Sequence, residues 1–346
     1  MYKCIIVIAL LLTSLTQVQA NDVGFLQFRA DSQTSRPLDI SVWYPTSQST
    51  PYSLIADNPA FVGTLVIRDA SVKPGRFPVV ILSHGYRGNW RNMNWLATRL
   101  AASGYLVTAV NHPGTTSRNH APQDARQWWQ RPIDLSRTLD SLTQHPLWAE
   151  HIDQRDISVI GHSLGGWSTL LLTGAEVDRE QLSRECQRSP NPRTCGVASE
   201  MGLFARQDDE PPRHLLRDAR VKRAILLDIG LAHSLSVSSL RQIDIPVLIL
   251  AAGVDIGDLP QSQESGFLSE HLPLRHTRYR VYQQAMHFSF LQLCKPDALT
   301  MLEQESKGDS IICRDAVGTQ RAALHETIYE DITAFLHQHR SPAPSL

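Results

Sequence analysis

The stretch ISVIGHSLGGWSTLLL, residues 157–172, decides the fold. Its first four residues are a short apolar strand, and the run after Leu164 has apolar residues at helical spacing. Between them lies G-x-S-x-G, a pattern whose glycines leave room for a sharp turn that exposes the hydroxyl of Ser163 above a sheet. The stretch therefore predicts a strand, a tight turn that carries a nucleophile, and a helix.

Apolar runs on both sides of this turn predict the rest of the sheet. The expected strands are Gly24–Ala30, Leu38–Tyr44, Phe77–Ser83, Tyr105–Val110, Ile157–Ile160, Val221–Leu227, Ile245–Ala251 and Tyr279–Tyr282. The expected helices are Asn92–Ala102, Ile133–Leu142, Leu164–Leu172 and Ala322–His337. This alternation predicts an α/β fold, doubly wound, with a mostly parallel eight-stranded sheet, an antiparallel entry hairpin and helices on both faces.

A serine hydroxyl needs a histidine that takes its proton and an acid that orients the histidine. In this architecture the chain order is serine, acid, histidine. His287 is the candidate base, because it follows the last expected strand and precedes the closing helix.

Two aspartates at the carboxyl ends of later strands compete as the acid. Asp255 follows the strand Ile245–Ala251, and Asp228 follows the strand Val221–Leu227. Asp255 is preferred, because the strand before the histidine more often supplies the acid. Asp228 stays as the alternative and Asp258 as a minor third option.

The oxyanion formed during attack needs donors that are already in place. The N–H of Leu164, at the start of the helix after Ser163, is one candidate. The N–H of Tyr86, in the loop after the strand Phe77–Ser83, is the other. The Tyr86 ring either forms a wall of the site or lies at the surface.

Residues 1–20 are typical of a secretory signal peptide. Lys3 precedes an apolar run that is shorter than the ~20 residues of a membrane-spanning helix, and VQA at 18–20 suits cleavage. Residues 21–346 are then expected to form a single domain without a membrane segment, either periplasmic or secreted.

Two polar segments interrupt the alternation of strands and helices. Residues 174–218 form an expected insertion over one end of the sheet, and residues 292–319 are similar in composition. The four cysteines that remain after signal cleavage are Cys186, Cys195, Cys294 and Cys313. An even number in an exported protein predicts two disulfides, and of three possible pairings the two local ones are favoured.

Composition excludes several classes of protein. Of 346 residues, 42% are hydrophobic and 19% charged, which fits a globular protein with a sizeable core. Lys and Arg number 33 against 34 Asp and Glu, so no basic excess favours nucleic acid. No cysteine or histidine spacing typical of a metal site occurs, so we expect no metal.

Three segments, LSHGYRGN at 82–89, GHSLGGWS at 161–168 and AMHFSF at 285–290, resemble the α/β-hydrolase superfamily. More narrowly, they are similar to the bacterial predicted dienelactone hydrolase group, which is related to platelet-activating-factor acetylhydrolases and cutinase-like polyester hydrolases. The resemblance implies carboxylic ester hydrolysis without a cofactor, Ser163 as nucleophile and His287 as base.

The branches of this resemblance differ at the acid. The cutinase-like pattern places it at Asp255 and the acetylhydrolase-like pattern at Asp228, so both stay open. Dienelactone hydrolases proper use a cysteine where this chain has Ser163, so their substrate is not implied.

The sequence therefore predicts an exported serine hydrolase that cleaves small-molecule or lipid esters through an acyl-enzyme on Ser163. A phospholipid acetylhydrolase or another acyl-transfer enzyme on the same triad is the first alternative. A binding protein that retains the fold without catalysis is the second.

Overall fold

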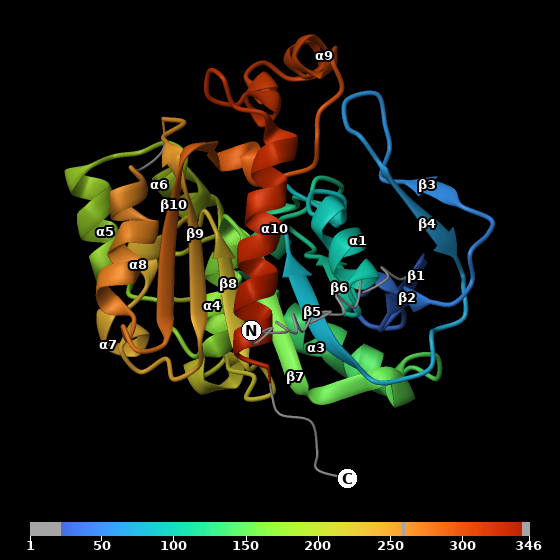
Figure 1. The fold of residues 1–346 in the computed structure, drawn as a ribbon. Coiled ribbons are helices and arrows are strands. Elements are labelled where there is room, and N and C mark those ends of the chain that lie inside the picture. The colour runs from blue at the N-terminus through green and yellow to red at the C-terminus, as the bar shows by residue number, and fades with distance from the viewer. Residues whose placement is uncertain (1–21, 258–259, 341–346) are drawn as a thin grey trace, which may run out of the picture.

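The computed structural model describes residues 22–257 and 260–340 (Figure 1). The predicted signal peptide at 1–20 and the option Asp258 lie outside the described residues. None of the helices in the described ranges has the length and apolar character needed to cross a bilayer.

Within the described ranges, ten strands form one mixed sheet in the order β10-β9-β8-β7-β5-β6-β2-β1-β4-β3. Their bounds are β1 Asp22–Ala30, β2 Leu38–Thr46, β3 Ser53–Ile55, β4 Thr64–Arg68, β5 Phe77–Ser83, β6 Leu106–Asn111, β7 Ile152–His162, β8 Arg223–Leu227, β9 Val247–Val254 and β10 Thr277–Met286. The six neighbouring strands β10, β9, β8, β7, β5 and β6 run parallel to one another. Strand β2 is antiparallel to both β1 and β6.

The expected number of eight strands was wrong, because β3 and β4 extend the sheet at one edge. β3 has three residues, and β4 pairs with β1 through only two register positions. Such short edge strands lack the long apolar run that marks a strand buried on both faces.

Helices cover both faces of the sheet (Figure 1). The longer ones are α1 Asn94–Ala102, α3 Gln130–Gln144, α4 Leu164–Thr173, α5 Arg179–Arg188, α6 Thr194–Glu200, α8 Ser265–His271, α9 Ala298–Glu305 and α10 Arg321–Gln338, and the four-residue helices are α2 Pro122–Ala125 and α7 Val237–Leu240. Helices α1 and α10 pack on one face, and α3, α4, α7 and α8 pack on the other.

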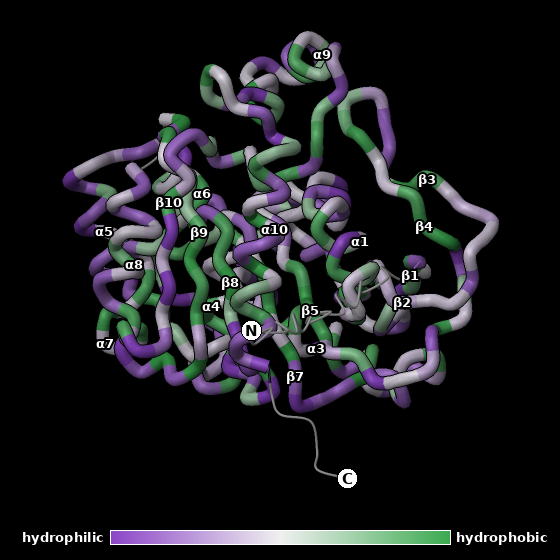
Figure 2. Tube along the Cα trace, viewed as in Figure 1, coloured by the Kyte–Doolittle hydropathy of each residue, from purple (hydrophilic) through white to green (hydrophobic). Residues whose placement is uncertain are grey.

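The central strand β5 shows why its sequence is continuously apolar. Val80 and Leu82 pack into the core under α1 and α10, whereas Val79 and Ile81 pack into the core under α3. Successive side chains of a strand point to opposite faces, and here both faces are covered. Figure 2 shows this as hydrophobic colour along the central strands.

The two polar segments each contain a disulfide, and both local pairings are confirmed. Cys186–Cys195 joins α5 to α6 in the segment 174–218, and Cys294–Cys313 closes the segment that contains α9. Helix α5 buries only Leu182, so its polar composition did not reveal a helix in the sequence.

The order of strands creates a crevice at one point of the sheet. From β5 the chain crosses to β6 on one side, and from β7 it crosses to β8 on the other. Loops that leave adjacent parallel strands in opposite directions leave a crevice at their carboxyl ends, where ligands bind in open α/β sheets. The loop after β5 carries Tyr86, and the turn after β7 carries Ser163.

Candidate active site

Ser163 lies in a strained turn between β7 and α4. Its φ of 54° and ψ of −123° are outside the regions that side chains normally favour. A Cβ on Gly161 would lie 2.1 Å from the carbonyl oxygen of Gly165, and one on Gly165 would lie 1.9 Å from that of Ser83. Both glycines of G-x-S-x-G are thus required by the close approach of backbones around the turn.

His287 begins the short 3₁₀ helix His287–Phe290 directly after β10. Its Nδ1 lies 2.6 Å from Oδ2 of Asp228, and both side chains are largely buried. The other carboxylate oxygen of Asp228 accepts the Ala252 N–H at 2.7 Å. A carboxylate in this position accepts a proton held on Nδ1, which makes Nε2 the ring nitrogen that can act as a base.

The preference for Asp255 does not agree with this geometry. Asp255 is exposed, and its Oδ1 accepts the N–H of Gln261 at 3.0 Å. Strand β8 ends immediately before Asp228, whereas β9 continues to Val254 and carries Asp255 further out. The carboxylate that contacts His287 is therefore the alternative, Asp228.

The turn that carries His287 is held from two helices. Nε1 of Trp95 on α1 donates to the carbonyl of Phe290 at 3.0 Å. Nε2 of His325 on α10 donates to the carbonyl of Ser289 at 3.0 Å. The Trp95 and His325 rings stack on each other at 3.8 Å, so the two supports stabilise one another.

His162, the residue before the nucleophile, is a site residue that the sequence reasoning missed. Its Nε2 donates to the backbone carbonyl of His287 at 2.8 Å. Burial lowers the pKa of His162 to about 3, so its ring is neutral beside His287. No sequence pattern distinguishes this contact from ordinary packing.

Ser163 and His287 line one cavity of ≈ 230 Å³. The other lining residues are Tyr86, Leu164, Arg193, Thr194, Val197, Asp228, Ile229, Gly230, Leu231, Ala252, Val254, Asp255, Ile256, Gln261, Glu264 and Phe288. Tyr86 therefore lies in the wall of the cavity, and its hydroxyl donates to Glu200 at the end of α6. Helix α6 of the disulfide-bearing segment also contributes Thr194 and Val197 to the lining.

The two expected oxyanion donors lie on this cavity. Leu164 is the first residue of α4, where the N–H has no acceptor within the helix. Among the described residues, neither its N–H nor that of Tyr86 has a protein hydrogen-bond partner. No group of three His, Cys, Asp or Glu side chains in the described ranges is placed to hold a metal ion.

Comparison with known proteins finds ester hydrolases. Residues 63–190 match a family model described as PET hydrolase-like. Bis(hydroxyethyl) terephthalate hydrolase of Streptomyces coelicolor is 29% identical over 110 residues, which are 32% of this chain and 33% of that protein. Cutinase cut1 of Thermobifida fusca is 30% identical over 104 residues, which are 30% of each chain. These matches span about a third of each relative's length, and they confirm the resemblance to cutinase-like polyester hydrolases.

A solved structure is similar over nearly the whole chain. The ferulic acid esterase from Streptomyces cinnamoneus matches 95% of this chain and 93% of its own, with a TM-score of 0.62 and 20% identity. At this identity the likeness shows the fold, which is that of an α/β-hydrolase.

Proposed function

Because the chain has the α/β-hydrolase fold and is related over residues 63–190 to cutinase-like polyester hydrolases, we propose that it is a serine hydrolase of carboxylic esters. The observation that carries the proposal is the 2.6 Å contact between His287 and Asp228 on the cavity that Ser163 also lines. Asp228 is assigned as the acid, and Asp255 as a residue of the cavity rim.

The proposed reaction has two steps. His287 Nε2 takes the hydroxyl proton as Ser163 Oγ attacks the ester carbonyl, and the N–H groups of Tyr86 and Leu164 stabilise the oxyanion. The C–O bond of the ester then breaks, and the alcohol leaves with the proton from His287. Water then attacks the acyl-enzyme as His287 takes one of its protons. The bond to Ser163 Oγ breaks, the acid leaves, and His287 returns the proton to Ser163 Oγ.

The neutral His162 supports this proton transfer. A charged ring next to His287 would oppose formation of the imidazolium during attack. Burial keeps His162 uncharged, and its bond to the His287 carbonyl fixes the backbone from which the base projects.

The named relatives are a bis(hydroxyethyl) terephthalate hydrolase, a cutinase and a ferulic acid esterase, and we extend this class of ester substrates to the present chain. A cavity of ≈ 230 Å³ suits a compact acyl group, and the Tyr86 ring in its wall suits a flat one. Two disulfides fit export to an oxidising compartment, which we propose to be the periplasm or the exterior of the cell. Residues 21–346 are proposed to act as one domain, with 174–218 as its insertion.

The direct test is Ser163→Ala, with Ser199→Ala on the exposed surface of α6 as the matched control. The wild type and Ser199→Ala should hydrolyse p-nitrophenyl esters and gain a fluorophosphonate adduct on the Ser163 peptide. Ser163→Ala should lose about 10³-fold or more in kcat and should not be labelled.

A side-by-side panel of p-nitrophenyl esters, bis(hydroxyethyl) terephthalate, a ferulate ester and an acetyl phospholipid defines the substrate class. Preference for the phospholipid would favour the acetylhydrolase alternative. A wild type that neither hydrolyses any of them nor is labelled would contradict the proposal and favour a binding protein.

A further inference from the structure

A buried arginine contacts both chain segments that supply the candidate oxyanion donors. Arg131, in the first turn of α3, is 1% exposed. Its Nε donates to Oγ of Ser168 at 2.8 Å, one Nη to Oγ1 of Thr115 at 2.5 Å, and the other Nη to the carbonyl of His84 at 2.5 Å. One planar cation thus joins α4, the loop after β6 and the loop after β5.

The first arm reaches the donor on α4. Ser168 lies one turn after Leu164, and its hydroxyl donates to the Leu164 carbonyl at 2.9 Å. Arg131 donates to the same Ser168 oxygen, so the guanidinium fixes the hydroxyl that is bonded to the first turn of the helix. The orientation of that turn sets the direction of the Leu164 N–H.

The second arm reaches the donor on the β5 loop through His84. The backbone N–H of His112 donates to Nε2 of His84 at 3.0 Å, so the proton of this neutral ring is on Nδ1. Nδ1 therefore donates to the Gly85 carbonyl at 2.7 Å, and the N–H of Gly88 donates to the same oxygen at 3.0 Å. In a trans peptide the C=O and N–H point in opposite directions, so two bonds on the Gly85 oxygen fix the direction of the Tyr86 N–H.

The surroundings keep each group in the state that these contacts require. Burial lowers the pKa of Arg131 to about 9, and the nearby carboxylate of Asp134 opposes this shift, so the guanidinium is a cation at neutral pH. Burial also lowers the pKa of His84 and of His112 well below the usual value, so both rings are neutral.

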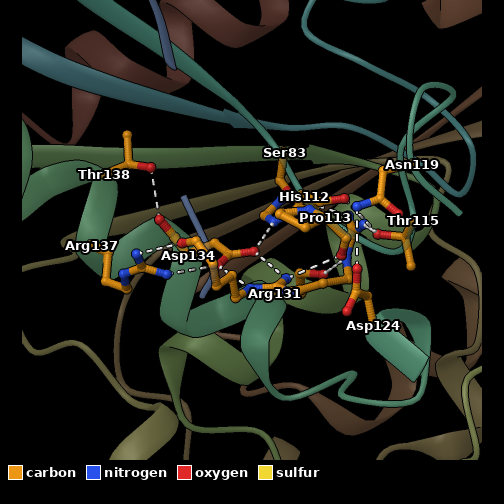
Figure 3. Close-up of polar contacts among 12 residues, drawn as sticks. Ser83, His112, Pro113, Thr115, Asn119, Asp124, Arg131, Asp134, Arg137 and Thr138 are labelled. Carbon is orange, nitrogen blue, oxygen red and sulfur yellow. Dashed lines mark hydrogen bonds and ion pairs between the residues drawn. The ribbon is translucent and has the colours of Figure 1, made fainter. Parts of the chain in front are cut away.

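A second group of residues, Ser83, His112 and Asp134, has the residue types of a catalytic triad. This group does not line the cavity on which Ser163 and His287 lie. Oγ of Ser83 lies 3.0 Å from Nε2 of His112, and Nδ1 of His112 lies 3.0 Å from Asp134 (Figure 3). All three are completely buried, so no substrate reaches them. They form the support of the loop that carries His84.

We propose that Arg131 is a positioning residue that holds both N–H donors of the oxyanion hole, the Tyr86 N–H through His84 and the Leu164 N–H through Ser168. This inference rests on the proposed esterase function. Arg131 does not line the cavity, yet it would affect the transition state through the two N–H groups, which stabilise the charge that develops during attack.

The test is Arg131→Lys, with Arg223→Lys as the matched control. Lysine keeps the charge but lacks the planar fork that reaches three acceptors at once. Arg223 is also a buried arginine, and it contacts Ser158 Oγ at 2.9 Å and the His339 carbonyl at 2.6 Å, outside the oxyanion segments. Both variants replace a buried arginine and are expected to lower the melting temperature. A loss of kcat that comes only from destabilisation should therefore occur in both.

The expected result is a change in kcat for one variant only. Arg131→Lys should lower kcat by about 10- to 100-fold with KM within about threefold, because lost oxyanion donors act in the transition state. The inhibition constant of a trifluoromethyl ketone, which places an oxyanion in the same hole, should rise by a similar factor. Arg223→Lys should keep both constants close to those of the wild type.

A second pair of variants tests the His84 arm. The amide nitrogen of asparagine occupies the place of Nδ1 and can donate to the Gly85 carbonyl, whereas alanine cannot. His84→Ala should therefore lower kcat, and His84→Asn should recover most of the loss.

The outcomes separate the two proposals. An active wild type whose Arg131→Lys variant keeps its kcat, or loses no more than Arg223→Lys does, would overturn the role of Arg131. A wild type without esterase activity or fluorophosphonate labelling would overturn the proposed function itself.

Discussion

Both carboxylate oxygens of Asp228 are used by the protein. One contacts His287 and the other accepts the Ala252 N–H, while the Asp228 backbone N–H donates to the Leu250 carbonyl at 2.8 Å. The side chain and backbone of this residue are therefore fixed together against the neighbouring strand β9. Such an acid can orient an imidazole without moving during the reaction.

We predict that Asp228→Asn lowers kcat by about 10³- to 10⁴-fold, because an amide no longer fixes the proton on Nδ1 of His287. Asp255→Asn should change KM at most, since Asp255 contacts Gln261 and not the histidine. Both are measured as kcat and KM on a short-chain p-nitrophenyl ester, with circular dichroism to verify folding. A large loss of kcat in Asp255→Asn alone would return the acid to Asp255.

At the scale of elements, α6 defines one side of the cavity. Thr194 and Val197 line it, and Glu200 accepts a hydrogen bond from the hydroxyl of Tyr86, another lining residue. The disulfide Cys186–Cys195 lies next to these residues and joins α6 to α5. The polar segment 174–218 thus has a defined shape at the place where an acyl group would bind.

A larger side chain in this wall should narrow the cavity and change which acyl groups the protein prefers. Val197→Trp is predicted to lower kcat/KM for long acyl esters by about tenfold relative to the acetyl ester, because the indole fills the cavity. Ser199→Trp, on the exposed side of the same helix, should leave the ratio unchanged. The ratio is read from p-nitrophenyl esters of increasing acyl length, and equal ratios in both variants would exclude α6 from specificity.

The elements that could be predicted from the sequence are those with strong local signals. Buried strands such as β5 show continuous apolar runs, and the elbow at 161–165 shows its glycines because the backbone there has no space for side chains. Strands β3 and β4 are short and lie at the edge, so no such run marks them. The choice between the two acids depended on where β8 and β9 end in space, and a sequence pattern locates strand ends only to within a few residues.

At the scale of the whole molecule, buried histidines link stability to pH. Burial lowers the pKa of His162 to about 3 and that of His325 to about 4, and it also lowers those of His84 and His112. In the unfolded chain these imidazoles bind protons below about pH 6.5, so between pH 7 and 5 the unfolded state binds more protons than the native state. The contribution of these neutral imidazoles to the free energy of unfolding is therefore fully present above about pH 6.5 and is lost progressively as the pH falls.

We expect His162 and His325 each to lower the free energy of unfolding by about 2 kcal/mol at pH 5. The melting temperature should then fall by at least about 5 °C between pH 7 and 5, as measured by circular dichroism. His325→Phe, which keeps a ring against Trp95, should reduce the slope of stability against pH by about one proton. A melting temperature that does not change over this range would contradict the linkage.

The backbone bonds at the ends of three neighbouring strands have a consequence for engineering. The Ser163 N–H donates to the Leu227 carbonyl at 3.0 Å, as the Asp228 N–H does to Leu250 on the next strand. Ser163 and Asp228, the proposed nucleophile and acid, are therefore aligned by ladder pairing, and a slip of one residue in β8 would turn its side chains to the opposite face. The segment 174–218 can be exchanged or lengthened while β7, β8 and β9 keep their pairing, whereas a single inserted residue within β8 would separate Asp228 from His287.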